Sequence, residues 1–554
     1  MRSKKALINS ISSLLSQLVT IICGFVLPRL ILSQFGSSYN GITSSITQFL
    51  NCVILLRAGV GGVTRAALYK PLADGDNNQI SGIVNATQQF MKKVSAIFSI
   101  LLLAFAIVYP LMVLDEFDYW FSFSLVIILG ISTVAQNYFG ITYQMLIQAD
   151  QRQYIYSILT IATTILNTIV AAILILSGAT IHVVKLGSAI VFIINPIILN
   201  LYVRKKYNIN KNVAVNNTAI SQRWDAFAQQ VAAFVNNNTD VIVLTMFANI
   251  REVSVYTVYY MVANGLRRIE ETLTNGIDAA FGNMIAKKEE DLLRTNVKLM
   301  EFIVFSSAGF VFLCGALLIE PFVMVYTKGI DDISYSRIWF GVLMCLNQYL
   351  FCVRLPYQML VEAAGHFKQT RNGAIVECVL NIVISVILVI KWGLIGVTIG
   401  TFCALVYRTT QYAIYSSTHI LRRKIWIAGK NVLINIIEAV IVIFIIKCMP
   451  VWNVTSYLSW LIYAVVVGMI TMFVIGASSF LFYRSEISLL SQKVKNALID
   501  SRHIITDLDK KEMKAKLNSI KQKKIEELLS ERITNLTPEE ILYLSIHLNS
   551  VLEK

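Results

Sequence analysis

The feature that most constrains the fold is an internal repeat. Tyr143–Ala149 (YQMLIQA) returns 214 residues further on as Tyr357–Ala363 (YQMLVEA), and Leu166-Asn167 returns at the same offset as Leu380-Asn381. Several matches at one register indicate two copies of one structural unit along the chain.

The composition places both copies in a membrane. The 554 residues are 56% hydrophobic and 15% charged, with a mean hydropathy of +0.63. Such a chain is too apolar for a soluble protein, and its apolar runs approach the ~20 residues that cross a bilayer. About fourteen transmembrane helices can be drawn, over 6–32, 38–66, 88–114, 119–147, 154–176, 179–203, 224–248, 253–282, 299–327, 334–362, 369–390, 393–420, 427–447 and 457–483.

Each copy of the repeat holds six spans, an even number, so both copies enter the membrane in the same direction. We therefore expect an all-α polytopic membrane protein with two parallel six-helix bundles and a cavity between them. The predicted domains are 1–210 and 211–424 for the bundles, 425–484 for two extra peripheral helices, and 485–554 for a cytoplasmic helical tail.

Basic residues set the predicted orientation. The tail from Arg484 on holds 13 Lys and Arg against 11 Asp and Glu, so most of the net charge of +15 belongs to the loops of the membrane part. Alternate loops are rich in Lys and Arg, which predicts that both termini are cytoplasmic and gives no reason to expect a nucleic-acid partner. The opposite side holds only four basic residues, Arg251, Lys328, Lys391 and Lys447.

Polar residues gather in the first two spans of each copy. In the eighth span they step by three or four residues, which places them on one face of a helix that we expect to line the cavity. That face carries Asn264, Arg268, Glu271, Asn275 and Asp278. The second span adds Asn40, Thr47 and Asn51, and the seventh adds Gln229, Asn236 and Asp240.

Three arginines are the candidate substrate-binding residues. Arg267 and Arg268 lie near the middle of the eighth span, and Arg57 lies deep in the second. Guanidinium groups at this depth suit a phosphate or pyrophosphate. The other interpretation is that these arginines form ion pairs within the helix, since Glu270 and Glu271 stand three or four residues away.

Acidic residues of the same spans, Asp240, Glu271 and Asp278, are candidates for charge balance or for binding a coupling H⁺ or Na⁺. We predict no catalytic residue, no metal site and no other cofactor. The chain has no Gly-x-x-x-x-Gly-Lys-Ser/Thr phosphate loop, so direct use of ATP is not expected.

The chain resembles polysaccharide-export flippases of the multidrug/oligosaccharidyl-lipid/polysaccharide exporter superfamily, which include O-antigen flippases. The resemblance rests on dispersed segments between residues 6 and 483, among them Asn9–Ser13, Gly36–Gly41, Leu68–Leu72, Asn238–Leu244 and Leu380–Ser385. It implies a V-shaped pair of bundles in the bacterial cytoplasmic (inner) membrane. It also implies alternating access that moves an undecaprenyl-pyrophosphate-linked oligosaccharide, a capsule, O-antigen or exopolysaccharide unit, from the inner to the outer leaflet.

Three other functions remain open at this point. A cation-coupled multidrug exporter would share the fold but should prefer an acidic, aromatic cavity. A membrane glycosyltransferase would need a large extramembrane domain, which the short loops do not provide, so we do not expect an enzyme. A non-transporting scaffold would use the tail to recruit polysaccharide synthesis proteins. The expected partners are the lipid-linked oligosaccharide, membrane lipids and, through 485–554, those synthesis proteins.

Overall fold

The computed structural model describes residues 2–51, 64–65, 67–72, 74–210, 213, 238–274, 277–450, 452–493 and 495. It divides into two units, Met1–Ser478 and Ser479–Lys554. In the second unit the described residues are helical over 479–482 and 484–493. The packing and the site described below belong to the first unit, which contains the helix α16 (Tyr457–Phe482) up to Ser478.

The described residues are helical or lie in the connections between helices. The first copy of the repeat contains α1 (Arg2–Phe35), α2 (Ser37–Leu50), α4 (Asn77–Met112), α5 (Tyr119–Ala135), η1 (Gln136–Gly140), α6 (Ile141–Ala149), α7 (Gln153–Leu176) and α8 (Ile181–Lys206). The second contains the short helix Asn238–Phe247, α10 (Ile250–Thr274), α11 (Ile277–Ala286), α12 (Glu290–Tyr326), α13 (Ile338–Ala363), α14 (Phe367–Tyr415) and η3 (Ser416–Ile420). The helices α15 (Trp426–Lys447) and α16 (Tyr457–Phe482) follow.

These helices are built for a lipid environment. Ten helices in the described part of the chain are long and apolar enough to cross a membrane. Many of their large apolar side chains point outward; Leu176 of α7 and Phe473 of α16, for example, are each 77% exposed. Water would penalise so much exposed apolar surface, whereas helices satisfy their own backbone hydrogen bonds in lipid. The chain is a multi-pass membrane protein.

The expected spans agree with these helices except at three places. The second and seventh expected spans run into residues outside the description. The eighth span corresponds to α10 and α11, and α10 is less apolar because it holds three arginines and three glutamates. The polar spans are therefore the ones that the described helices cover least completely.

The two copies match helix for helix. Moving α4 (36 residues) along the chain by the repeat offset brings it onto α12 (37 residues), and moving α7 brings it onto the first half of α14. α14 is a hairpin, since Gly393 has a non-helical conformation with φ +51°. Its two arms touch where the Ser385 hydroxyl donates to the Val397 carbonyl at 3.2 Å. The sequence repeat is thus a structural repeat.

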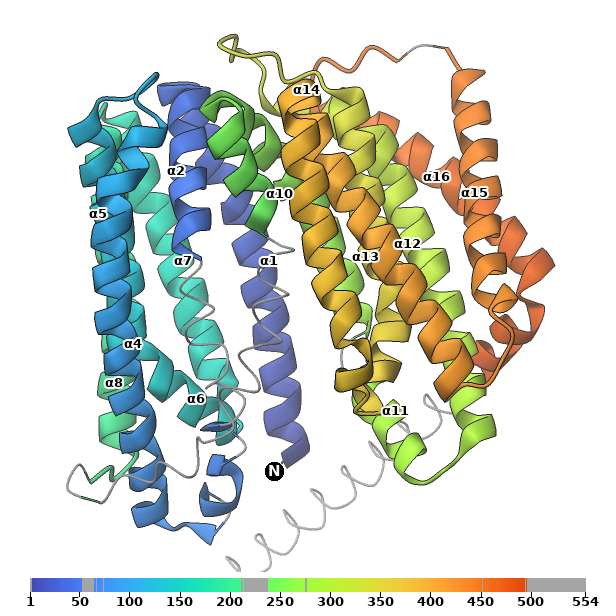
Figure 1. The fold of residues 1–554 in the computed structure, drawn as a ribbon, viewed down its shortest axis with the longest axis horizontal. Coiled ribbons are helices and arrows are strands. Elements are labelled where there is room, and N and C mark those ends of the chain that lie inside the picture. Colours follow the sequence, from blue (N-terminus) through green and yellow to red (C-terminus); the bar gives the residue numbers. More distant parts are fainter. Residues whose placement is uncertain are drawn as a thin grey trace, which may run out of the picture. The chain divides into compact units, whose positions relative to one another are not determined.

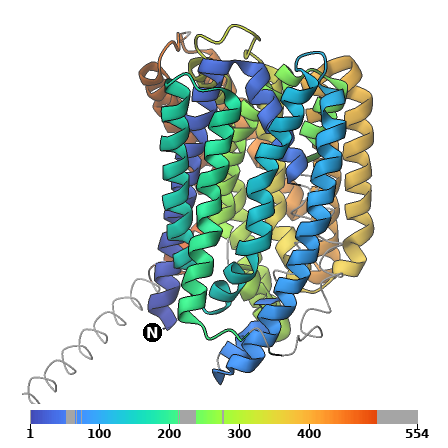
Figure 2. The same ribbon diagram turned by 90° about the vertical axis from the view of Figure 1, so that its left-hand side faces the viewer.

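Each copy forms a helical bundle of its own. In the first, α1 packs on α7 and α4 on α5; in the second, α12 packs on α13 and α13 on α14 (Figure 1). The long blue-to-green helices of the first bundle lie roughly parallel or antiparallel to one another in the side view (Figure 2). The two bundles meet mainly where α2 crosses α10.

The helices α15 and α16 add to the second bundle. α15 packs on α12, where the Asn435 amide donates to the Phe305 carbonyl at 2.9 Å. The chain between η3 and α15 is fixed to α12 by a buried ion pair, in which Arg423 Nη1 lies 2.8 Å from Glu301 Oε2. This pair anchors the start of the two extra helices.

Candidate functional site

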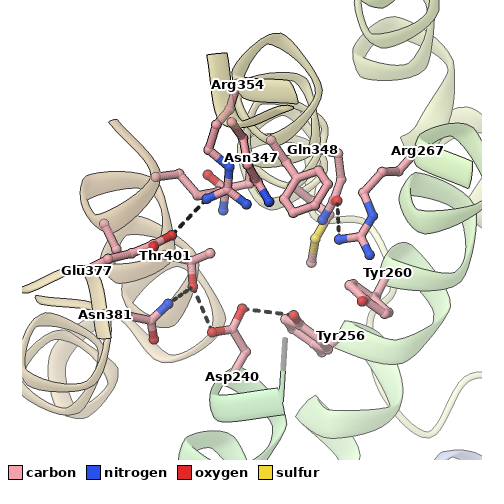
Figure 3. A pocket seen from close by; sticks show the side chains of 15 residues that line it. Asp240, Tyr256, Tyr260, Arg267, Asn347, Gln348, Arg354, Glu377, Asn381 and Thr401 are labelled. Carbon is pink, nitrogen blue, oxygen red and sulfur yellow. Dashed lines mark hydrogen bonds and ion pairs between the residues drawn. The ribbon is translucent and has the colours of Figure 1, made fainter. Parts of the chain in front are cut away.

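A polar pocket lies inside the second bundle (Figure 3). Its walls come from the helix Asn238–Phe247, α10, α13 and α14, and its cavity measures about 160 Å³. The polar lining consists of Asp240, Tyr256, Tyr260, Arg267, Asn347, Gln348, Arg354, Gln358, Glu377, Asn381 and Thr401. Polar groups enclosed by membrane helices are costly and commonly mark a binding site or an ion pathway.

Asp240 is a buried carboxylate on one wall of this pocket. It accepts hydrogen bonds from Tyr256 Oη at 2.9 Å and from Thr401 Oγ1 at 2.7 Å. The Asn381 amide nitrogen donates to the same Thr401 hydroxyl at 3.1 Å, which holds it in place (Figure 3). The ion pairs of the described residues do not include Asp240. A carboxylate held by neutral donors is suited to take up a proton or a small cation.

Arg267 lines the pocket, whereas Arg268 does not. Arg267 Nε lies 3.2 Å from Glu271, its Nη1 lies 3.4 Å from Gln348 Oε1, and its guanidinium carbon sits 4.3 Å from the centroid of the Phe351 ring. Arg268 is exposed. Successive residues of a helix point about 100° apart, so the two arginines cannot face the same cavity.

One of the ion pairs that the sequence allowed within α10 is present. Arg267 pairs with Glu271 at i,i+4. Glu270 instead accepts a hydrogen bond from the Ser307 hydroxyl of α12 at 2.8 Å. Glu271 is 35% exposed, so it remains partly accessible and the pair is open to exchange for another anion.

A cluster of three charged residues, none of them among the site residues expected from the sequence, lies at the pocket. Glu377 of α14 pairs with Arg354 of α13 at 2.9 Å and with Arg408 of the second arm of α14 at 3.4 Å. The signal was present, because each of these charges interrupts an apolar span. Their convergence depends on the hairpin of α14, which sequence spacing does not reveal.

Other expected site residues lie elsewhere. Asn40 is buried at the α2–α10 crossing, where its amide donates to Ser254 Oγ at 2.9 Å. Thr47 donates to the backbone of its own helix and Asn51 to Gln48. Asn264 is partly buried on α10. Arg57, Gln229, Asn236 and Asn275, and the side chain of Asp278, lie outside the described residues.

The α2–α10 crossing closes one end of the contact between the bundles. Besides the Asn40–Ser254 bond, Ser45 Oγ lies 2.8 Å from Thr245 Oγ1. Asn40 and Ser254 are separated by 214 residues, the offset of the repeat. Equivalent residues meet in this way only near a two-fold axis, so the crossing lies close to the pseudo-symmetry axis of the repeat.

Connecting loops reinforce this crossing from both bundles. Asp332, between α12 and α13, accepts from the Ser37 backbone N–H at 2.6 Å and so caps the start of α2. Glu116, between α4 and α5, pairs with Arg251 at the start of α10 at 3.3 Å. Each bundle thus contributes an acidic loop residue to the first residues of a helix in the other.

Comparison with solved structures finds transporters of one fold. The chain is similar to the lipid II flippase MurJ in an inward closed conformation, with a TM-score of 0.63 and 15% identity over 87% of this chain and 100% of that chain. It is also similar to an inward-facing multidrug resistance MATE family transporter of the MOP superfamily (TM-score 0.53, 14% identity, 72% and 95% covered). A eukaryotic MATE transporter is similar too, with a TM-score of 0.54 and 12% identity over 77% of this chain and 98% of that chain.

No protein-family model matches the chain, and a search of curated proteins finds no match either. At 12–15% identity the structural likeness establishes the fold: an all-α polytopic membrane protein built like MurJ and the MATE transporters, as expected from the sequence. Activity has to be argued from the site.

Proposed function

We propose that the chain is a flippase that moves an undecaprenyl-pyrophosphate-linked oligosaccharide, such as a capsule, O-antigen or exopolysaccharide unit, from the inner to the outer leaflet by alternating access. The observation that carries the proposal is the pocket of the second bundle, where guanidinium groups and amides line a cavity enclosed by membrane helices. Guanidinium groups suit phosphate oxygens, and amides can replace the water around sugar hydroxyls. The MurJ-like fold supports the same class of substrate.

In this proposal each charged residue has a role that follows from its exposure and its contacts. Arg267 at the pocket wall receives one phosphate group of the pyrophosphate, and Arg268, exposed on the neighbouring face of α10, receives the other from outside the pocket. The proposal assigns Arg57 the same role because of its place in the second expected span. Glu271 is the counter-ion that the phosphate displaces from Arg267. Asp240 takes the coupling H⁺ or Na⁺, because its buried carboxylate has hydroxyl donors and no ion-pair partner among the described residues.

Location and direction belong to the same proposal. Both termini would lie in the cytoplasm, on the inner side of a bacterial cytoplasmic membrane, because basic loop residues favour that side. The α2–α10 crossing would then close the outer end of the contact between the bundles. The tail 485–554 would offer a cytoplasmic contact for polysaccharide synthesis proteins.

A second candidate is a cation-coupled multidrug exporter. It is favoured by the acidic and aromatic wall of the same pocket, where Asp240 lies beside the stacked rings of Tyr256 and Tyr260. A buried carboxylate with aromatic faces can attract an organic cation. The arginines of the pocket oppose such a cargo.

Transport by the purified protein in proteoliposomes distinguishes the two candidates. The flippase should expose a fluorescent undecaprenyl-pyrophosphate-linked oligosaccharide to an added lectin, and it should not accumulate ethidium. Arg267→Ala and Arg268→Ala should each slow exposure by about tenfold or more, as expected for the loss of a charged hydrogen bond. Arg204→Ala, which removes an exposed arginine at the end of α8, is the matched control. Wild-type rates in both test variants would refute the pyrophosphate site.

A further inference from the structure

Three buried charges beside the pocket do not balance. Glu377 is shared by Arg354 and Arg408, and the side chains of the three residues are only 4%, 9% and 6% exposed. Two guanidinium groups and one carboxylate leave one positive charge in excess within this triad. The triad alone therefore carries a net charge of +1, which favours an anionic group in the adjoining pocket.

The excess charge is directed to the pocket through Arg354. Arg408 is fully used by the protein, since it also donates to the Thr370 carbonyl at 2.9 Å and to Tyr412 Oη at 2.6 Å. Arg354 lines the pocket, and its Nε is buried with no hydrogen-bond partner. An unpartnered guanidinium nitrogen at this depth points to a ligand with an anionic group.

Amide oxygens in the same pocket lack donors. The buried side-chain oxygens of Asn347, Asn381 and Gln358 have no hydrogen-bond partner. The amide nitrogens of these residues are occupied: Asn347 donates to the Thr398 carbonyl at 3.0 Å, for example. The pocket is therefore complementary to a ligand that accepts a hydrogen bond from a guanidinium group and donates hydrogen bonds from several hydroxyl groups.

We propose that this pocket binds an acidic sugar residue of the transported glycan. Arg354 holds the sugar's carboxylate, and the amide oxygens of Asn347, Asn381 and Gln358 accept from its hydroxyls. The inference rests on the proposed function and adds to it the chemical class of the cargo. The cavity of about 160 Å³ limits the ligand to a small group such as a single sugar ring.

Arg354 and Arg267 line the same pocket but have different ion-pair partners. The guanidinium carbons of Arg354 and Arg267 lie 4.6 Å and 4.3 Å from the centroid of the same Phe351 ring. Arg267 has its own counter-ion in Glu271, so its charge is not part of the excess. Asp240 is the other carboxylate facing the cavity, and its neutralisation by H⁺ or Na⁺ would favour the anion at Arg354.

Ligand binding to the purified full-length protein tests the subsite directly. Glucuronate should raise the thermal unfolding midpoint, whereas glucose, its neutral match, should not. Arg354→Gln should abolish the glucuronate shift, and Arg204→Gln should keep it. Arg354→Gln should still fold, because Glu377 retains Arg408. An equal shift with glucose, or an undiminished glucuronate shift in Arg354→Gln, would overturn the proposal.

Inorganic pyrophosphate distinguishes the two sources of an anion. If pyrophosphate stabilises the wild type and Arg354→Gln abolishes that shift but not the glucuronate shift, the anion at Arg354 is the diphosphate of the carrier and the sugar assignment is wrong. If Arg354→Gln abolishes only the glucuronate shift, the assignment stands.

Transport separates a failure of the subsite from a failure of the proposed function. With acidic and neutral lipid-linked glycans of equal length, Arg354→Gln should lower the ratio of acidic to neutral transport by about tenfold. An unchanged ratio would refute the subsite while leaving the flippase intact. If the wild type moves neither glycan, the proposed function fails, and the glucuronate measurement alone decides the subsite.

Discussion

The contact between α2 and α10 depends on one glycine. A Cβ atom built on Gly41 would lie 2.1 Å from the Ile250 carbonyl oxygen. Carbon and oxygen atoms do not approach so closely, and this neighbour is backbone that cannot rotate away. Gly41→Ala should therefore force the two helices about 1 Å apart where they cross, as overpacking of a tight contact does.

Two buried hydrogen bonds set the size of the effect. The Asn40–Ser254 and Ser45–Thr245 bonds, at 2.9 Å and 2.8 Å, cross the same contact and would be stretched beyond useful length. Each is worth about 0.5–1.5 kcal/mol, so the closed conformation should lose about 1–3 kcal/mol. A change of that size shifts a conformational equilibrium by about 5–150-fold.

Accessibility of a buried cysteine measures the shift. Ser45→Cys, in a chain whose eight native cysteines are replaced by alanine, places a thiol where the native side chain is fully buried. The reporter itself gives up the Ser45–Thr245 bond, so Gly41→Ala acts through the Asn40–Ser254 bond and should raise the labelling rate by a membrane-impermeant maleimide at least about twofold. Gly265→Ala is the control, because a Cβ there meets no atom within 4 Å. Equal labelling in the two glycine variants would refute the reasoning.

Three further changes test other parts of the chain. Arg423→Met should lower stability by about 3–5 kcal/mol by leaving Glu301 buried and unpaired, and the double change with Glu301→Met should recover most of the loss in thermal unfolding; no recovery would contradict the pairing. Gly400→Ala should lower the free energy of unfolding by about 1–3 kcal/mol, because its Cβ would lie 2.6 Å from the backbone nitrogen of Ser385. Gly476→Ala, whose Cβ meets no atom within 4 Å, should change it little. Equal thermal unfolding midpoints for the two variants would rule out close packing of the α14 hairpin. Asp240→Asn should remove the dependence of transport on an H⁺ or Na⁺ gradient, measured in proteoliposomes, and a retained dependence would place coupling elsewhere.

The fold could largely be read from the sequence because its signals are local. An apolar run of membrane length predicts a helix wherever it occurs, and the repeat fixes how many such helices belong to a unit. The offset of 214 residues found in the sequence also relates the helices α4 and α12 of the structure. The spacing of charges in α10 allowed an ion pair within the helix as one of two interpretations, and Arg267 does pair with Glu271.

What the sequence could not decide is which polar side chains meet. Asn40 was expected at a cavity, but its neighbour is Ser254, and only the crossing of α2 with α10 brings the two together. Arg354, Glu377 and Arg408 stand on separate helical segments, and the turn at Gly393 with the packing of α13 makes them one cluster. Helical periodicity tells which residues share a face of one helix, whereas the partner of that face is set by packing between helices, which is a property of the tertiary structure.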